Sequence, residues 1–285
     1  MNNIKSIEVE GDKIAMRIGV LVNLDNNIEQ EIKKVHDMGF SSCQLSCWNM
    51  NMYSDEIAET VNKATKQYGV SVSTVWGGWQ GPGIWDFYDG PSTLGLVPTA
   101  YRNDRIKDIM KASDFAKKIG VENVATHMGF LPENPATEEY RSLVCAIRYL
   151  AQYVKNNGQY LLFETGQETP ITLKRTIEDV GTGNLGINLD PANLILYGKA
   201  NPVDALDVFG EYVRDVHGKD GCYPTDGKNL GEEKPLGEGK VNFPAFISKL
   251  KEIGYDGPIT IEREISGDKQ IEDIKNAKAL LEKLI

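Results

Sequence analysis

Four short apolar runs in the second half of the chain each end on a residue that can bind a metal. They finish on two glutamates, one aspartate and one histidine: Tyr160–Glu164, Leu185–Asp190, Val213–His217 and Pro258–Glu262. Runs of this length are too short for helices and are typical of buried strands. Carboxylates and an imidazole together form a donor set for a divalent cation of hard or borderline character. The pattern predicts a metal site made of Glu164, Asp190, His217 and Glu262.

The other histidines are weaker candidates. A single carboxylate or histidine is more often explained by a helix cap or by core packing, and it is the repetition at four run ends that favours a site. His127 closes the run Asn123–His127 and is therefore a candidate substrate contact or additional ligand. His36 falls in the last turn of a predicted helix, Asn27–Met38, where the helix dipole explains it. We assign His36 no function.

The candidate ligands can act together only if their strands deliver them to one place. An amphipathic stretch, a glycine and a short apolar run recur in that order, with the glycines at Gly39, Gly69, Gly120, Gly158 and Gly254. This order predicts parallel strands joined by helices. The further apolar runs are Met16–Val22, Ser42–Ser46, Val70–Trp76 and Asn123–His127. About eight strands close a (β/α)8 TIM barrel, which carries its active site at the C-terminal ends of the strands. An open doubly wound sheet is the less favoured alternative, because no glycine-rich phosphate loop follows the first strand.

Two long excursions interrupt this rhythm. Residues 77–98 follow the third strand, and residues 218–241 follow the strand that ends at His217. All four tryptophans, Trp48, Trp76, Trp79 and Trp85, lie at or just after the second and third strands. Flat aromatic faces suit the C–H faces of a sugar ring, although packing within the loop would use the same residues. We expect Trp48 and Trp79 to contact a substrate.

Composition bounds the remaining possibilities. With 285 residues, 41% of them hydrophobic, the chain is long enough for one large α/β domain, and we predict a single barrel domain over residues 1–285. The net charge of −10 disfavours a nucleic-acid surface, and no apolar run approaches the length of a membrane span. The four cysteines lack metal-ligand spacing and are expected to be reduced thiols. These features predict a cytoplasmic protein, and a homo-oligomer is compatible with them.

The ordered motifs resemble those of the xylose isomerase-like TIM-barrel superfamily, in particular the sugar phosphate isomerase/epimerase group with its ketose 3-epimerases. The motifs are Phe163-Glu164-Thr165-Gly166-Gln167-Glu168, Asn188-Leu189-Asp190-Pro191-Ala192-Asn193, Val216-His217-Gly218-Lys219-Asp220 and Pro258-Ile259-Thr260-Ile261-Glu262. The resemblance implies one Mn²⁺, Mg²⁺, Co²⁺ or Zn²⁺ held by Glu164, Asp190, His217 and Glu262. It also implies that Glu164 and Glu262 are the catalytic acid/base pair. Asn193 stands where the epimerases usually carry a histidine, and Lys219 lies near the place of their arginine. We expect both, together with Glu168 and His127, to bind substrate.

The predicted reaction is proton abstraction next to a carbonyl. A metal bound to a carbonyl and an adjacent hydroxyl stabilises an enediolate, so one glutamate can remove a proton and the other can return it to the opposite face. The leading hypothesis is a metal-dependent isomerase or epimerase of a sugar or keto-sugar. A lyase or deglycosidase acting on 3-keto-glycosides through the same enediolate is the alternative. An abasic-site endonuclease is disfavoured by the presence of only three histidines, and a non-catalytic sugar-binding barrel is the remaining rival.

Overall fold

Eight parallel strands form a closed barrel in the computed structural model of the chain, which describes residues 16–285. They are β1 (Arg17–Asn23), β2 (Ser42–Cys47), β3 (Ser71–Gly77), β4 (Asn123–Thr126), β5 (Tyr160–Glu164), β6 (Leu185–Leu189), β7 (Val213–Gly218) and β10 (Pro258–Ile261). Each strand pairs with its neighbours in the sequence, and β1 closes the circle against β10. The predicted TIM barrel is confirmed. Residues 1–15 of the predicted domain lie outside the described part.

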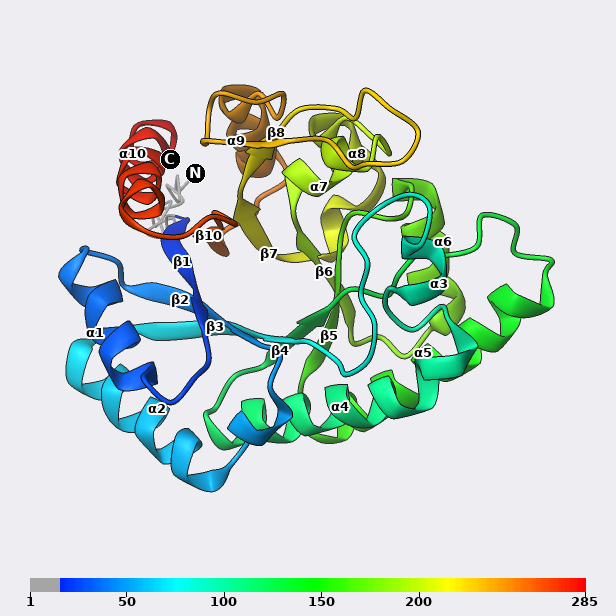
Figure 1. Cartoon of the computed structure of the whole chain (residues 1–285), viewed down its shortest axis with the longest axis horizontal. Coiled ribbons are helices and arrows are strands. Elements are labelled where there is room, and N and C mark those ends of the chain that lie inside the picture. The colour runs from blue at the N-terminus through cyan, green and yellow to red at the C-terminus, as the bar shows by residue number, and fades with distance from the viewer. Residues whose placement is uncertain (1–15) are drawn as a thin grey trace, which may run out of the picture.

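Helices connect the strands and surround them, so the strands occupy the middle of the molecule (Figure 1). The helices are α1 (Ile28–Asp37), α2 (Asp55–Tyr68), α3 (Gly90–Thr93), α4 (Thr99–Lys118), α5 (Glu138–Asn156), α6 (Pro170–Val180), α7 (Pro191–Leu196), α8 (Pro202–Phe209), α9 (Phe243–Glu252) and α10 (Asp268–Leu284). Two 3₁₀ turns, Met50–Met52 and Gly210–Tyr212, complete the connections. None of these helices is both long and apolar enough to cross a membrane.

The helical periodicity read from the sequence corresponds to buried faces. In α1 the residues at helical spacing, Ile28, Ile32 and Val35, are all buried against the barrel. The chain leaves α2 through Gly69, which adopts a left-handed conformation (φ 64°) that a residue with a Cβ atom rarely takes. The predicted helix Asn27–Met38 is one residue longer at each end than α1.

Three strands, β4, β6 and β10, are one residue shorter than predicted, so the residue that follows each of them lies just beyond the strand. β6 stops at Leu189 because the Asp190 side chain accepts a hydrogen bond from the Asn193 backbone N–H and so begins α7. Proline is well suited to the first turn of a helix, which explains why Pro191 follows at once. Similarly, β4 ends at Thr126, and His127 lies just beyond it.

The two predicted excursions meet each other. Residues 77–98 contain the short helix α3, and residues 218–241 contain a small antiparallel pair, β8 (Asp220–Gly221) with β9 (Glu233–Lys234). The Phe87 backbone N–H donates a 2.8 Å hydrogen bond to the carbonyl of Lys228, and Asp86 forms an isolated β-bridge with Asn229. Since the excursions follow β3 and β7, they approach each other at the C-terminal rim of the barrel.

Candidate metal centre

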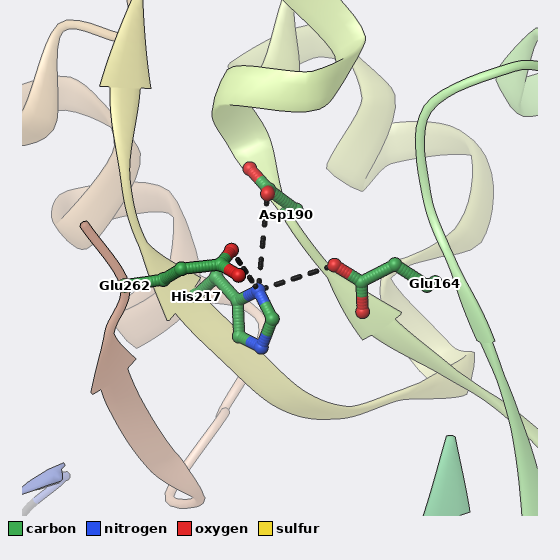
Figure 2. A group of neighbouring side chains, drawn as sticks. All are labelled: Glu164, Asp190, His217 and Glu262. Carbon is green, nitrogen blue, oxygen red and sulfur yellow. Dashed lines mark ion pairs between the residues drawn. The ribbon is translucent and has the colours of Figure 1, made fainter. Parts of the chain in front are cut away.

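Glu164, Asp190, His217 and Glu262 converge at this rim, as Figure 2 shows. One ligand atom from each lies within 4.8 Å of those of the other three. Glu164 is the last residue of β5, His217 lies near the end of β7, and Asp190 and Glu262 immediately follow β6 and β10. The barrel brings them together because its parallel strands all end at the same rim.

The imidazole of His217 is the centre of the group. Its Nδ1 lies 3.1 Å from Glu164 Oε1, 3.1 Å from Glu262 Oε2 and 3.8 Å from Asp190 Oδ2. Its other nitrogen, Nε2, faces away from the carboxylates and lies 2.8 Å from Oε1 of Gln44. The ring is therefore oriented with Nδ1 toward the predicted ligands.

Asp190 uses its two oxygens differently. Oδ1 accepts the hydrogen bond that begins α7, whereas Oδ2 is buried without a hydrogen-bond partner and faces the cluster. Thr165 fixes the backbone here, since its hydroxyl accepts from the Asp190 N–H at 2.8 Å and donates to the Asp190 carbonyl at 2.9 Å. One carboxylate thus caps a helix with one oxygen and directs the other toward His217 and Lys219.

The donor set fits a divalent cation. Nδ1 of His217 and Oδ2 of Asp190 are both buried and make no hydrogen bond of good geometry, although Nδ1 lies close to two carboxylates and Oδ2 lies close to Lys219. A buried polar atom without a hydrogen bond is costly unless another group satisfies it. Three carboxylates and one imidazole suit Mn²⁺, Mg²⁺, Co²⁺ or Zn²⁺. Glu164, Asp190, His217 and Glu262 are the residues that would hold such an ion.

Burial and mutual charge shift the pKa values of the cluster. Burial raises the pKa of Glu164 to about 7, while the nearby His217 opposes that shift. Burial also acts to raise the pKa of Glu262, but the positive charges of Lys219 and His217 outweigh it and lower that pKa. Burial acts to lower the pKa of His217, yet the charges of Glu164 and Glu262 raise it well above its ordinary value. The two glutamates therefore differ in their electrostatic surroundings.

Lys219 adds a buried ammonium to the group. Its Nζ lies 3.1 Å from Glu262 Oε2, 3.4 Å from Asp190 Oδ2 and 3.1 Å from Glu264 Oε1. Although burial acts to lower the pKa of Lys219, these carboxylates raise it well above its usual range. Lys219 is consequently a fixed positive charge at the candidate site, not a neutral amine.

A cavity of about 300 Å³ opens beside the cluster, a size at the lower end of small-molecule sites. It is lined by Leu21, Ser46, Trp48, Trp76, Trp85, His127, Glu164, Asn193, Leu196, Tyr197, His217, Lys219, Leu230, Glu262 and Glu264. Four of the predicted substrate contacts, Trp48, His127, Asn193 and Lys219, are among these residues. Three of the four predicted ligands, all but Asp190, and most predicted contacts thus line one cavity.

Two predicted substrate contacts, Trp79 and Glu168, do not line the cavity. Trp79 is buried, and its ring centroid lies 5.2 Å from that of Trp48. The guanidinium carbon of Arg105 lies over the Trp79 ring, 5.0 Å from its centroid. The Trp79 ring therefore packs within the loop and does not contact the cavity, which is the alternative role for these tryptophans. Glu168 is buried beyond the lining, where desolvation raises its pKa to about 8.

Trp85 lines the cavity in the position expected of Trp79. It is 40% exposed, and its ring centroid lies 5.0 Å from that of His127. Burial, with the charge of Lys219, lowers the pKa of His127 to about 3, so this imidazole is neutral. The loop sequence contained both tryptophans, but nothing in it indicated which ring faces inward.

A parallel eight-stranded barrel with acidic and histidine side chains at its C-terminal rim defines the class of this protein. The family model of the xylose isomerase-like TIM barrel matches residues 32–284, and the chain belongs to that family. A solved xylose isomerase domain protein from Planctomyces limnophilus is 36% identical over 95% of this chain and 97% of that one, with a TM-score of 0.89.

Two further relatives are more distant. The uncharacterized protein MJ1311 of Methanocaldococcus jannaschii is 25% identical over 95% of this chain and 89% of its own length. A D-tagatose 3-epimerase-like protein of known structure is 22% identical, covers 94% of this chain and 98% of that one, and has a TM-score of 0.73. At this identity the likeness is one of fold.

Proposed function

We propose that the protein is a divalent-metal-dependent isomerase or epimerase of a sugar or keto-sugar. The observation that carries the proposal is the placement of Glu164 and Glu262. Both carboxylates approach Nδ1 of His217 to 3.1 Å, from strands on opposite sides of it (Figure 2). Both line the same cavity, so a small substrate there would have a carboxylate on either side.

The chain supplies proton transfer and substrate orientation. A divalent ion held by the cluster would polarise a substrate carbonyl and stabilise negative charge on its oxygen. Glu164 and Glu262 would exchange a proton with the carbon next to that carbonyl, one removing it and the other returning it. The Lys219 ammonium would donate a hydrogen bond to a substrate oxygen, while the exposed faces of Trp48 and Trp85 would contact the C–H face of a sugar ring.

The resemblance in fold to a D-tagatose 3-epimerase-like protein supports this assignment without specifying a substrate. A lyase acting on 3-keto-glycosides would use the same first proton abstraction and is the second candidate. The half-exposed Trp48 and Trp85 leave the cavity open on one side, where the second ring of such a substrate would extend. The cytoplasmic location and the oligomeric state remain predictions.

The proposal is tested by metal content together with hydrogen exchange. Purified wild type, Glu164→Gln and Glu262→Gln would be analysed for bound metal and then incubated in D₂O with a panel of ketoses and 3-keto-glycosides. Asp108→Asn is a suitable control, because Asp108 is a buried carboxylate on α4 that accepts from the Gln80 N–H and takes no part in the cluster. We expect deuterium incorporation by wild type and the control and not by the two glutamate variants.

The products separate the candidates. Deuterated epimer or isomer supports the leading proposal, whereas release of the aglycone from a 3-keto-glycoside identifies the lyase. Metal binding with no exchange into any compound would instead indicate a sugar-binding barrel. A well-folded wild-type protein that binds none of the four metals would refute the assignment.

A further inference from the structure

A chain of buried amides connects two of the candidate metal ligands. Gln44, on β2, and Asn188, on β6, are both fully buried inside the barrel. Gln44 Oε1 lies 2.8 Å from Nε2 of His217, and Gln44 Nε2 donates to Asn188 Oδ1 at 3.3 Å. Asn188 Nδ2 in turn donates to Oε2 of Glu164. The connection therefore runs from His217 through two amides to Glu164, on the side of the ligands that faces away from the cavity.

The carboxylate at one end fixes the direction of every hydrogen bond in this chain. A carboxylate oxygen accepts hydrogen bonds, and in the structure Asn188 presents its NH₂ group to Oε2 of Glu164. Its oxygen is then left to face Gln44, which must present its own NH₂ group there. Gln44 is left with its oxygen toward His217. An acceptor 2.8 Å from Nε2 requires a proton on that nitrogen.

One further close contact competes with this direction. Asn188 Nδ2 also lies 3.1 Å from His217 Nε2. With Nε2 unprotonated, the contact would be a hydrogen bond, but the Gln44 oxygen would then face a lone pair at 2.8 Å with no proton between them. Turning the Gln44 amide over would place two oxygens against each other at the Asn188 end. With a proton on Nε2, the Asn188 NH₂ group and the Nε2–H are two donors 3.1 Å apart, so Asn188 donates to Glu164 and not to His217. The shorter, 2.8 Å contact with Gln44 Oε1 is the one that places the proton on Nε2.

We propose that Gln44 and Asn188 are positioning residues for the metal centre. By holding the proton of His217 on Nε2, they keep the ring turned so that Nδ1 faces Glu164, Asp190 and Glu262. The same chain holds one oxygen of Glu164 and leaves the other, Oε1, directed to Nδ1. The inference rests on the proposed function, because it assigns these amides a role toward the metal. Outer partners of this kind orient metal ligands and set the affinity of the site.

The test combines metal affinity with a direct observation of the imidazole nitrogens. Mn²⁺ dissociation constants would be measured for wild type, Gln44→Met and Asn188→Asp, which preserve side-chain size. Gln159→Met is the matched control: Gln159 is also a buried amide, bonded to Ser113 and the Val121 carbonyl, and does not contact the ligands. ¹⁵N spectra of histidine-labelled, metal-free protein would then report how fast the Nε2 proton exchanges with solvent, in a chain with only three histidines.

We expect Nε2 of His217 to carry a proton protected from solvent exchange in wild type and in Gln159→Met, and Gln44→Met to lose that protection. Gln44→Met and Asn188→Asp should bind Mn²⁺ about 10- to 100-fold more weakly than wild type, with Gln159→Met unchanged. Equal protection of the Nε2 proton in wild type and Gln44→Met, or equal Mn²⁺ affinity in all four proteins, would overturn the proposal. If wild type binds no metal, the proposed function fails, and the comparison of Nε2 proton exchange between wild type and Gln44→Met decides by itself whether Gln44 holds that proton.

Discussion

Replacing Lys219 by methionine should destabilise the metal-free protein strongly. The Lys219 side chain is buried, and its Nζ lies 3.1 Å from Glu262 Oε2 and 3.4 Å from Asp190 Oδ2. Methionine keeps the apolar stem and removes the charge. The carboxylates would then remain buried at the rim of the barrel with His217 as their nearest cation.

The magnitude follows from the geometry. At 3.1 Å and an effective dielectric constant of about 20, the attraction between Lys219 and Glu262 is about 332/(20 × 3.1), or roughly 5 kcal/mol. Desolvation of the ammonium offsets part of this attraction. Removing one partner of a buried ion pair nevertheless costs about 3–5 kcal/mol, because the other charge is left uncompensated. We expect Lys219→Met to lower the free energy of unfolding by that amount in the absence of metal.

The assay is urea unfolding followed by tryptophan fluorescence, first in EDTA and then with saturating Mn²⁺. A bound cation would compensate the carboxylates, so the difference between variant and wild type should shrink when Mn²⁺ is present. Lys174→Met is the control, since its surface ion pair with Glu211 contributes about 0–1 kcal/mol. A Lys219→Met protein within about 1 kcal/mol of wild type in EDTA would refute this account of the charge balance.

Three further predictions concern the loop, the backbone and the buried acid. Trp79→Ala should lower the free energy of unfolding by about 3–5 kcal/mol because Trp79 is buried, whereas Trp85→Ala should mainly weaken sugar binding. Urea unfolding and sugar titration of both variants would measure the two effects, and equal losses of stability would contradict this prediction. Gly95→Ala should be about 1–3 kcal/mol more destabilising than Gly120→Ala. Both glycines have positive φ, but only a Cβ at Gly95 would meet the backbone, 2.1 Å from the carbonyl carbon of Met128. Equal melting temperatures of the two variants would refute this prediction. Burial raises the pKa of Glu168 from 4.5 to about 8, so the folded state holds this proton more tightly, and the resulting stabilisation is present below pH 4.5 and lost as the pH rises through 8. The free energy of unfolding of wild type should therefore fall relative to that of Glu168→Gln between these pH values. If the two proteins show the same dependence of unfolding free energy on pH, the raised pKa of Glu168 is excluded.

Much of the fold and of the metal site could be predicted because both depend on strands. A buried strand is short, apolar and bounded by turn residues, so Tyr160–Glu164 was identified with the observed ends. Parallel strands end at a common rim, which places Glu164, Asp190, His217 and Glu262 together without any knowledge of the loops. The short helix after Asp190 was missed, because six residues, Pro191–Leu196, show too little periodicity to be recognised.

The inner residues of the site were not predictable in the same way. Gln44 and Asn188 lie within apolar runs, and a polar residue in a strand does not show by itself which side chain it will meet across the barrel. Their partner, His217, is far from Gln44 in the sequence and comes within 2.8 Å only because the barrel closes. The contact depends on the diameter and stagger of the whole sheet.

The sequence by itself therefore determined the kind of fold and the set of candidate ligands, since alternation, length and terminal residue are local properties of each strand. Only the tertiary structure decided which side chains face the cavity. Trp79 and Trp85 have the same chemistry and lie in one loop, yet Arg105 stacks on Trp79 within the loop, while Trp85 lines the site beside His127. In such an irregular segment, the direction of each side chain is set by its packing partners, because no backbone period fixes it.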